Sequence, residues 1–559
     1  MKIKEISREI YRQRQNFIIL GLTGRTGSGC STAANILSQE KESILYLRQN
    51  SHDDPVESRR RVILTKHFDH TWKPFTVIKV RDVISTFILE CSFDEINSYL
   101  RSLSERLDFT KEKDYFLEVK QISECMNPVY SHHHENAKAE DVYCFISKTL
   151  PRFTEKFKEH VETAVKEDVI GVFQKIGNNI RKHGDAVEKS EILLDHVYSL
   201  SDRINQIIKT IRHYNEERLL PDYFVVDSFR NPIEIKFFQE RYSAFYLIAI
   251  TCDENNRKER LIGDKVPYDQ IDSIDSVEYS RKNILKDHVS FISQDISGCI
   301  EFADIYICND GSMQERDLKP LAYQLLKYVS LIKHPGIVTP SNDERLMQIA
   351  FDAKLNSGCL SRQVGASISD DSGKLLSIGW NDSPGDQTPC LLRSANELLG
   401  EQNSKIFSHY EQSTPEFKEK LRAYTEQRQS AADYGLNLSY CFKAIKNSLD
   451  QEKNQVHTRS IHAEESAFLS LVGSSGNAKG GTLYTTASPC VLCAKKAYHL
   501  GIARVVYIDP YPDISFEHIF RFGERVLIHD LFSGAVGSAY HRLYLPIVSY
   551  KDELGSYVD

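Results

Sequence analysis

Four residues near the C-terminal end have the types and spacing of a metal site that performs hydrolysis. His462 and Glu464 lie two positions apart, and Cys490 and Cys493 follow within Pro-Cys-Val-Leu-Cys. Imidazole and thiolate are ligands that Zn²⁺ prefers, and three protein ligands leave a fourth position open for water, as a catalytic zinc requires. Zinc lowers the pKa of that water to about 7, which makes a nucleophile available at neutral pH.

The spacing also indicates a role for each residue. Cys490 and Cys493, at i and i+3, project from one face of a helix start, where the positive end of the helix dipole favours thiolates. Pro489 suits the entry to that helix. Glu464 lies two residues past the histidine, so we expect it near the metal but not bound to it. There it would transfer protons between the water and the substrate.

A purely structural zinc site is the alternative interpretation. A closed site needs a fourth protein ligand, and His457 is near enough in the sequence to supply one. That interpretation leaves Glu464 without a purpose. The sequence therefore favours a catalytic zinc.

Alternating helices and strands are expected to position these residues. Apolar periodicity predicts an amphipathic helix at 343–357, a hairpin at 364–381, helices at 462–472 and 490–500, and strands at 482–486 and 503–508. The polar stretch 391–455 is interpreted as an insertion of loops and helices. The fold class predicted for this region is α/β, a mixed sheet with helices on both faces.

The motifs around the four residues resemble those of a known family. His-x-Glu followed by Pro-Cys-x-x-Cys is the signature of zinc deaminases. The motifs SGCLSRQVGAS, SIGWN, IHAEESA, GGTLYTTASPCVLCAKK and GIARVVYIDPYP occur in the order seen in the deoxycytidylate deaminase branch of the cytidine deaminase superfamily. The resemblance covers about residues 343–511 and implies a five-stranded mixed sheet. It also implies hydrolytic deamination of free deoxycytidine nucleotides, dCTP or dCMP, to deoxyuridine nucleotides.

The resemblance implies further site residues. Asn381 would hydrogen-bond the sugar hydroxyl of the substrate, and Val364 and Ala366 would line the pocket for the base. Cys359 and Cys390 fall where some deoxycytidylate deaminases hold a second, structural zinc, with a further ligand from Cys441 or His457. The alternative is that both cysteines are ordinary buried thiols.

A glycine-rich segment near the N-terminus has the spacing of a phosphate-binding loop. It runs from Gly24 to Ser31, called here the glycine loop, and its candidate nucleotide-binding residues are Gly24, Gly27, Ser28, Gly29, Cys30 and Ser31. It follows a predicted strand and opens a predicted helix, so its backbone N–H groups would converge on phosphate oxygens. Ser31 would ligate Mg²⁺. Cys30 stands where the motif has a lysine, and a neutral thiol supplies no positive charge.

Further residues make this region resemble P-loop nucleoside and nucleotide kinases. Asp227 ends a strand, where an acidic residue near Mg²⁺ belongs, and Arg257 and Arg260 follow another strand. Three interpretations remain: a nucleotide-binding sensor without kinase activity, a kinase that uses a lysine or arginine from elsewhere, and a structural remnant that binds no phosphate. The missing lysine favours the sensor.

The chain is long enough for more than one hydrophobic core, since it has 559 residues. Residues 1–335 are predicted to form a P-loop kinase-like domain with a parallel sheet and a helical insertion at about 92–217. Residues 340–559 are predicted to form the deaminase-like domain. The boundary is a Pro- and Gly-containing segment, KHPGIVTPS, at 333–341.

The charge balance argues for a small substrate. The formal net charge is −8, and residues 341–559 contain 22 Lys and Arg against 26 Asp and Glu. Proteins that bind long nucleic acids usually carry a basic excess. Two alternatives remain open: a deaminase that edits cytosine or adenine in a nucleic acid strand, and a signalling protein whose deaminase domain only senses nucleotides.

The cellular setting is inferred from composition and resemblance. The N-terminus lacks the apolar core of a secretory signal, no run is apolar enough to span a bilayer, and the twelve cysteines are mostly scattered. We therefore expect a cytoplasmic protein with no membrane contact. The two-domain architecture resembles bacterial antiphage dCTP/dCMP deaminases. That resemblance implies depletion of deoxycytidine nucleotides during phage replication, a hexamer or other homo-oligomer, and control by an inhibitory RNA or a nucleotide regulator.

Overall fold

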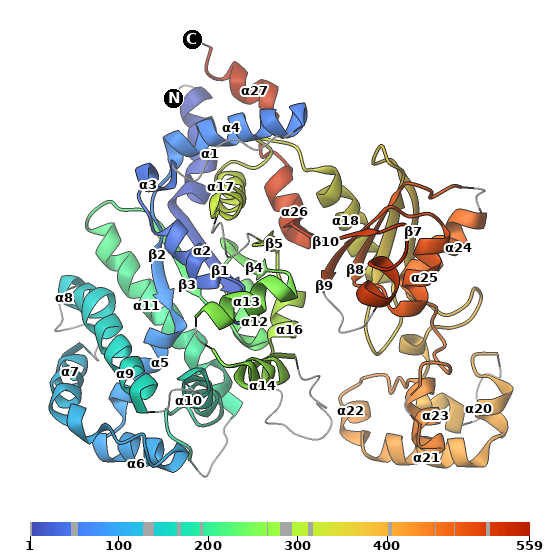
Figure 1. Ribbon diagram of the computed structural model, residues 1–559, viewed down its shortest axis with the longest axis horizontal. Coiled ribbons are helices and arrows are strands. Elements are labelled where there is room, and N and C mark those ends of the chain that lie inside the picture. Colours follow the sequence, from blue (N-terminus) through green and yellow to red (C-terminus); the bar gives the residue numbers. More distant parts are fainter. Residues whose placement is uncertain are drawn as a thin grey trace. The chain divides into compact units, whose positions relative to one another are not determined.

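The chain divides into two units. A computed structural model describes residues 3–45, 54–126, 139–164, 169–189, 194–264, 266–279, 293–310, 317–400, 405–452, 454–473, 476–509 and 515–558. The first unit contains Met1–Thr339 together with Ser538–Asp559, and the second contains Pro340–Gly537. Figure 1 shows both units. Residues 510–512, the end of the motif GIARVVYIDPYP, lie outside the described residues.

The first unit is built on a parallel sheet. Its strands are β1 (Phe17–Thr23), β2 (Thr76–Lys79), β3 (Asp222–Asp227), β4 (Phe245–Thr251) and β5 (Ile305–Cys308), in the spatial order β5-β4-β1-β3-β2. Every residue of β4 is buried, and β1 is buried after its first residue. Continuous apolar strands of this kind form because helices cover both faces of a parallel sheet. The α/β class expected from the sequence is confirmed.

Helices make up the rest of the first unit. They are α1 (Ile3–Asn16), α2 (Cys30–Leu37), α3 (Lys41–Leu45), α4 (Pro55–Thr71), α5 (Val80–Glu90), α6 (Phe93–Leu103), α7 (Lys113–Met126), α8 (Ala139–Cys144), α9 (Leu150–Ala164), α10 (Val169–His183), α11 (Ser199–Glu216), α12 (Pro232–Arg241), α13 (Glu254–Gly263), α14 (Tyr268–Tyr279), α16 (Ile296–Glu301), α17 (Lys319–Lys333), α26 (Gly537–Tyr544) and α27 (Tyr550–Gly555). Between β2 and β3, every described element is helical.

The last residues of the chain pack in the first unit, although the sequence placed all of 340–559 in the second domain. Glu553 in α27 accepts hydrogen bonds from Tyr11 in α1 (3.3 Å) and lies 2.9 Å from the imidazole of His334. The guanidinium of Arg542 donates to the backbone of Phe245 at the start of β4. These long-range contacts carry no local sequence signal, so the boundary of the deaminase domain at its C-terminal side is corrected from 559 to 537.

The second unit is built on a mixed five-stranded sheet in the order β10-β9-β8-β6-β7. The strands are β6 (Gly365–Ser369), β7 (Leu375–Trp380), β8 (Thr482–Ala487), β9 (Arg504–Asp509) and β10 (Ile528–Leu531), and a short strand β11 covers Gly534–Ala535. Strand β6 is antiparallel to β7 and β8, whereas β8, β9 and β10 are mutually parallel. The hairpin and the mixed sheet expected from the sequence are both present.

Helices pack on both faces of this sheet. They are α18 (Asn342–Ala353), α24 (Ala463–Gly473) and α25 (Val491–His499). Ala366 and Ile368 of β6 share a core with α24 and α25, whereas the hydroxyl of Ser367 donates to Leu346 in α18. Because neighbouring residues of a strand point to opposite faces, α18 covers one face and the other two helices cover the opposite face.

A glycine in β7 allows α24 to approach the sheet closely. A Cβ atom at Gly379 would lie 2.3 Å from the backbone nitrogen of Ala467 and 2.4 Å from the carbonyl oxygen of Ala463. Both atoms belong to the backbone of α24 and cannot move aside as a flexible side chain would. The start of α24, where the candidate zinc ligand and acid lie, therefore packs directly on the strand.

The polar segment between β7 and α24 forms a helical subdomain with its own core. Its helices are α19 (Ala395–Leu399), α20 (His409–Ser413), α21 (Pro415–Glu426), α22 (Gln429–Asp433) and α23 (Phe442–Asp450). Phe417, Leu421 and Tyr440 are fully buried in its core. A buried ion pair joins Arg393 to Glu411, and the hydroxyl of Tyr440 bonds both side chains.

No helix in the described part of the chain is long and apolar enough to cross a bilayer.

Candidate active site

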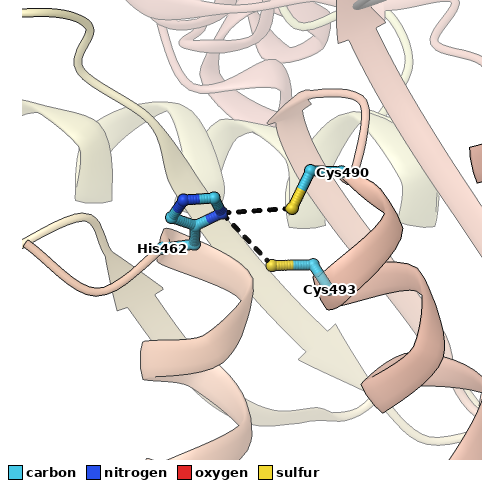
Figure 2. A group of neighbouring side chains, drawn as sticks. All are labelled: His462, Cys490 and Cys493. Atoms are coloured by element: carbon cyan, nitrogen blue, oxygen red, sulfur yellow. Dashed lines mark hydrogen bonds between the residues drawn. The ribbon is translucent and has the colours of Figure 1, made fainter. Parts of the chain in front are cut away.

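The three expected zinc ligands converge in the second unit. The Nδ1 atom of His462 lies 3.4 Å from Sγ of Cys490 and 3.5 Å from Sγ of Cys493. Figure 2 shows the imidazole facing both sulfur atoms. One ligand atom from each residue lies within 4.8 Å of the other two, and the described residues contain no other group of three or more such side chains.

Local structure explains how two short motifs deliver these ligands. His462 directly precedes α24, and Cys490 is the N-cap of α25 with Cys493 in its first turn. Cys490 makes no side-chain cap hydrogen bond, so its thiol is not used by the helix. The hydroxyl of Ser515 donates to the carbonyl of Pro489 at 2.8 Å, which fixes the entry to α25.

The donor set fits zinc with an open coordination position. Two thiols and one imidazole within 4.8 Å match the ligands and compactness of a three-ligand zinc site. His457, the fourth ligand of a closed site, is instead oriented towards Asp450, with 3.7 Å between Nε2 and Oδ2. The geometry of the described residues therefore favours the open site over the closed one.

Glu464 lies beside these ligands in a buried position. It occupies the first turn of α24, two residues after His462, and only 4% of the residue is exposed. Burial raises the pKa of its carboxyl to about 7. A buried carboxyl next to a metal site, outside the ligand set, is placed to exchange protons with a bound substrate.

Of the three residues expected to contact substrate, Ala366 and Val364 lie at the core that α24 and α25 share. Ala366 is fully buried in the core with Ala463, and Val364 packs against that core. Asn381 follows β7 and bonds the backbone with both ends of its amide. Its Oδ1 accepts from the Val364 nitrogen and its Nδ2 donates to the Arg362 carbonyl, each at 2.7 Å. One N–H and one lone pair of Asn381 remain for a ligand.

The described residues do not support the second zinc. Cys359 and Cys390 belong to no group of three potential ligands. Cys390 is buried, and its sulfur lies 3.9 Å from the guanidinium of Arg459. A fixed positive charge beside the thiol disfavours a divalent cation, so the pair is better described as ordinary thiols.

Arg459 itself was not singled out in the sequence. Arg459 lies three residues before His462. Its guanidinium donates to the carbonyl of Thr388 and to Oε1 of Gln387, each at 3.1 Å. These bonds join the segment after β7 to the residues that directly precede His462. A lone arginine in a polar stretch carries no motif signal, although its closeness to His462 in sequence was visible.

The glycine loop of the first unit lies at the C-terminal end of β1, between β1 and α2. Gly29 is the N-cap of α2 with φ 110°, a left-handed conformation, and a Cβ there would lie 2.3 Å from the amide nitrogen of Asn309. Gly27 is also left-handed, with φ 88°, whereas Gly24 and Ser28 pack tightly within the loop. Because β3 and β4 lie on opposite sides of β1, the loop is at the point where strand order reverses, a common ligand position in such sheets.

Two residues of the loop bear on the predicted nucleotide site, which stays a prediction. The hydroxyl of Ser31 donates to Oδ2 of Asp227 at 2.8 Å, which brings the two candidate Mg²⁺ contacts together. Burial raises the pKa of Cys30 to about 12, so this thiol is neutral. Arg257 and Arg260 supply no free cation in its place. Arg257 pairs with Asp275, and Arg260 donates to the backbone carbonyl of Asn309.

An acidic residue binds one backbone N–H group and one hydroxyl of the loop. Glu278 in α14 accepts from the backbone nitrogen of Thr26 at 3.1 Å and from its hydroxyl at 2.5 Å. The side chain of Glu278 is fully buried and pairs with Arg230 at 2.6 Å. This contact was not predictable from the sequence, because 252 residues separate Glu278 from Thr26.

Comparisons with known proteins single out the same region. Residues 340–509 match the cytidine and deoxycytidylate deaminase zinc-binding region. Deoxycytidylate deaminase of Enterobacteria phage T4 is 29% identical over 168 residues, 30% of this chain and 77% of the phage protein. The enzyme of phage T2 is 28% identical over 170 residues, 30% and 79% of the two chains.

A solved structure is also similar. The dCMP deaminase of cyanophage S-TIM5, crystallised with dCMP and dUMP, is 19% identical with a TM-score of 0.22, covering 35% of this chain and 99% of its own. The sequence matches and the His462–Cys490–Cys493 cluster fall within one unit. Residues 340–509 are therefore similar to the zinc-binding region of cytidine and deoxycytidylate deaminases, and the cluster of His462, Cys490 and Cys493 lies within this region.

Proposed function

We propose that the second unit converts deoxycytidine nucleotides, dCMP or dCTP, into deoxyuridine nucleotides in a zinc-dependent hydrolysis. The observation that carries this proposal is the cluster of His462, Cys490 and Cys493 with the buried Glu464 in the first turn of α24. The relatives that match this region in sequence are named deoxycytidylate deaminases. Deamination of dCMP is therefore the simplest form of the reaction.

The residues of the chain divide the work of the reaction. His462, Cys490 and Cys493 would hold the zinc, which when bound supplies a water of lowered pKa. Glu464 would carry one proton from that water to N3 of the cytosine and a second proton from the new C4 hydroxyl to the departing amine. A C4–O bond forms, the C4–N bond breaks, and ammonia leaves. Asn381 holds the backbone of 362–364 and offers its remaining N–H to the sugar.

Free nucleotides fit the charge of this unit better than a strand of nucleic acid. Residues 341–537 contain 20 Lys and Arg against 23 Asp and Glu, an acidic excess that provides no basic track for a phosphodiester backbone. Zinc deaminases that edit strands must also hold the flanking nucleotides. Editing of a nucleic acid strand is therefore the second candidate function of this unit, after deamination of free nucleotides.

A substrate panel tests the proposed reaction. Purified, zinc-loaded full-length protein is incubated with dCMP, dCTP, CMP, CTP and a cytosine-containing single strand, and uracil products are separated by chromatography. We expect product from dCMP, dCTP or both. Turnover of the single strand alone would overturn the free-nucleotide assignment in favour of editing. An enzyme inactive on the whole panel, with and without ATP and Mg²⁺, would contradict the proposed reaction.

For the first unit we propose a nucleotide-binding regulatory role without phosphoryl transfer. The Ser31–Asp227 pair and the left-handed glycines support phosphate and Mg²⁺ binding, and the neutral Cys30 argues against catalysis. From the resemblance stated above, we extend the proposal to a homo-oligomeric cytoplasmic enzyme. Such an enzyme would deplete the deoxycytidine nucleotide pool in antiphage defence, under the control of an RNA or a nucleotide.

Replacing Glu278 by glutamine is expected to strengthen nucleotide binding at the glycine loop. The carboxylate now accepts from the N–H of Thr26, which a phosphate would use, and its charge repels an incoming phosphate. We expect the Kd for ATP with Mg²⁺, measured by calorimetry, to fall at least about tenfold, a difference of 1.4 kcal/mol.

A matched control for this variant is Asp272→Asn, an exposed acid on the same helix, which should leave the Kd unchanged. The proposed competition is wrong if Glu278→Gln weakens ATP binding or leaves it as in the wild type. Thermal unfolding of each variant shows that the comparison is made between folded proteins.

A further inference from the structure

A cavity of about 780 Å³ opens in the first unit at the end of the sheet opposite the glycine loop. Asn16, which precedes β1, and Asp222, which begins β3, both line it. The glycine loop follows the other end of β1. Seven residues of strand separate these two ends, roughly 20 Å at the usual rise per residue. The cavity is therefore separate from the glycine loop, and neither proposed function uses it.

One lining residue, Lys333, is a buried cation without an acidic partner. Lys333 ends α17, is 1% exposed, and donates a single hydrogen bond to the carbonyl of Thr71 at 2.7 Å. Its ammonium also lies over the ring of Tyr223 at 4.4 Å. Among the described residues no carboxylate pairs with it. Burial, together with the nearby charge of Lys73, lowers the pKa of Lys333 to about 7. A bound anion would supply the missing countercharge.

The rim of the cavity adds more positive charge. Lys73, Lys209 and Arg212 line it together with two histidines, His70 and His213, against the acids Glu216 and Asp222. Asp222 is already paired with Arg212 at 3.0 Å. Glu216 is thus the one lining acid left to balance three lysines, the exposed Lys73 and Lys209 and the buried Lys333. This is a local basic excess in a chain whose net charge is −8.

Helix dipoles explain part of this arrangement but not all of it. The last residues of α1, α4, α11 and α17 line the cavity, and basic side chains near helix C-termini contribute about 0.3–1 kcal/mol each. The bond from Lys333 to Thr71 is such a contact at the end of α4. It uses one of three ammonium donors, and a gain of that size is small against the cost of burying an unpaired charge.

We propose that this cavity binds an organic phosphate, with the buried Lys333 and the rim residues Lys73 and Lys209 as its anion contacts. Three cationic groups suit a phosphate better than a single carboxylate. An apolar wall of Leu219, Leu220 and Pro221 suits the organic part of the ligand. The volume lies within the range of about 300–1,000 Å³ that is usual for small-molecule sites, and orthophosphate alone would leave most of it unfilled.

Calorimetry on the full-length protein tests the site directly. ATP, AMP and inorganic pyrophosphate are titrated without Mg²⁺, so that the proposed Mg²⁺-dependent site at the glycine loop contributes least. We expect saturable binding of at least one probe. We further expect Lys333→Met and Lys209→Ala each to raise its Kd at least tenfold. Lys66→Ala is the matched control, because Lys66 is an exposed lysine of α4 that does not line the cavity, and it should leave the Kd unchanged.

Thermal unfolding separates a binding lysine from a structural one. If Lys333 is kept for an anion, Lys333→Met removes an uncompensated buried charge, and the Tm without ligand stays level or rises. A large fall in the Tm of Lys333→Met, together with unchanged probe binding by Lys209→Ala, would overturn the proposal. So would the absence of saturable binding of all three probes, or binding that responds to Glu278→Gln but not to Lys209→Ala. None of these outcomes depends on deaminase activity, so they are distinguishable from failure of the proposed reaction.

Discussion

Glu464→Gln is expected to lower kcat for nucleotide deamination by about 10³-fold while leaving zinc content unchanged. Glutamine has nearly the same shape as glutamate but cannot take a proton from water and return it to the base. Glu464 is buried in the first turn of α24 and lies outside the cluster of His462, Cys490 and Cys493. Zinc per chain is measured by atomic emission, and turnover by chromatography of the uracil product.

The next residue of the same helix provides the control. Glu465 is partly exposed and pairs with Lys496 in α25 at 2.5 Å. Glu465→Gln removes a charge at the adjacent position without removing a proton carrier, so turnover should stay within a few-fold of the wild type. The assigned role of Glu464 is wrong if its glutamine variant keeps more than a tenth of wild-type kcat. Loss of zinc from that variant would make Glu464 a ligand instead.

Cys490→Ser and Cys493→Ser are each expected to abolish both zinc binding and deamination. A serine hydroxyl is a far poorer zinc ligand than a thiolate, and two remaining ligands do not make a stable site. Because metal binding stabilises the folded state, we also expect a lower Tm for the zinc-loaded preparations of these variants than for the wild type. Zinc content should fall from about one per chain to background.

Two other cysteines of the same unit test how many zinc ions the chain holds. Cys359→Ser and Cys390→Ser should keep zinc content and activity at wild-type levels, because these cysteines belong to no three-ligand group and Cys390 faces Arg459. Two zinc ions per wild-type chain, with one lost in either variant, would restore the second site. Full zinc content in Cys490→Ser would contradict the ligand assignment.

The zinc ligands were predictable because each motif acts locally. His462 and Glu464 share the start of one helix, and Cys490 and Cys493 share the start of another, so their relative positions follow from helix geometry alone. The strands were predictable for the same reason: β6 and β7 flank a short polar turn, and β8 and β9 are short runs rich in β-branched and aromatic residues. Local periodicity decides such elements before any long-range contact forms.

Contacts between distant segments were not predictable in this way. Asn381 looked like a group held ready for substrate, yet both ends of its amide bond the backbone of 362–364. The last residues of the chain were assigned to the deaminase domain, yet Glu553 bonds Tyr11 and His334 in the first unit. Neither partner choice leaves a trace in composition or spacing.

The sequence by itself determined the α/β class, and it predicted the candidate zinc ligands, the candidate proton carrier and the position of the glycine loop. Only the tertiary structure decided that Glu278 occupies that loop, that Arg459 lies beside Cys390, and that Lys333 is buried at a basic cavity. The physical reason is one of range. Ligand chemistry and helix starts depend on neighbours a few residues away, whereas countercharge, burial and cavities depend on segments that meet only after the chain has packed.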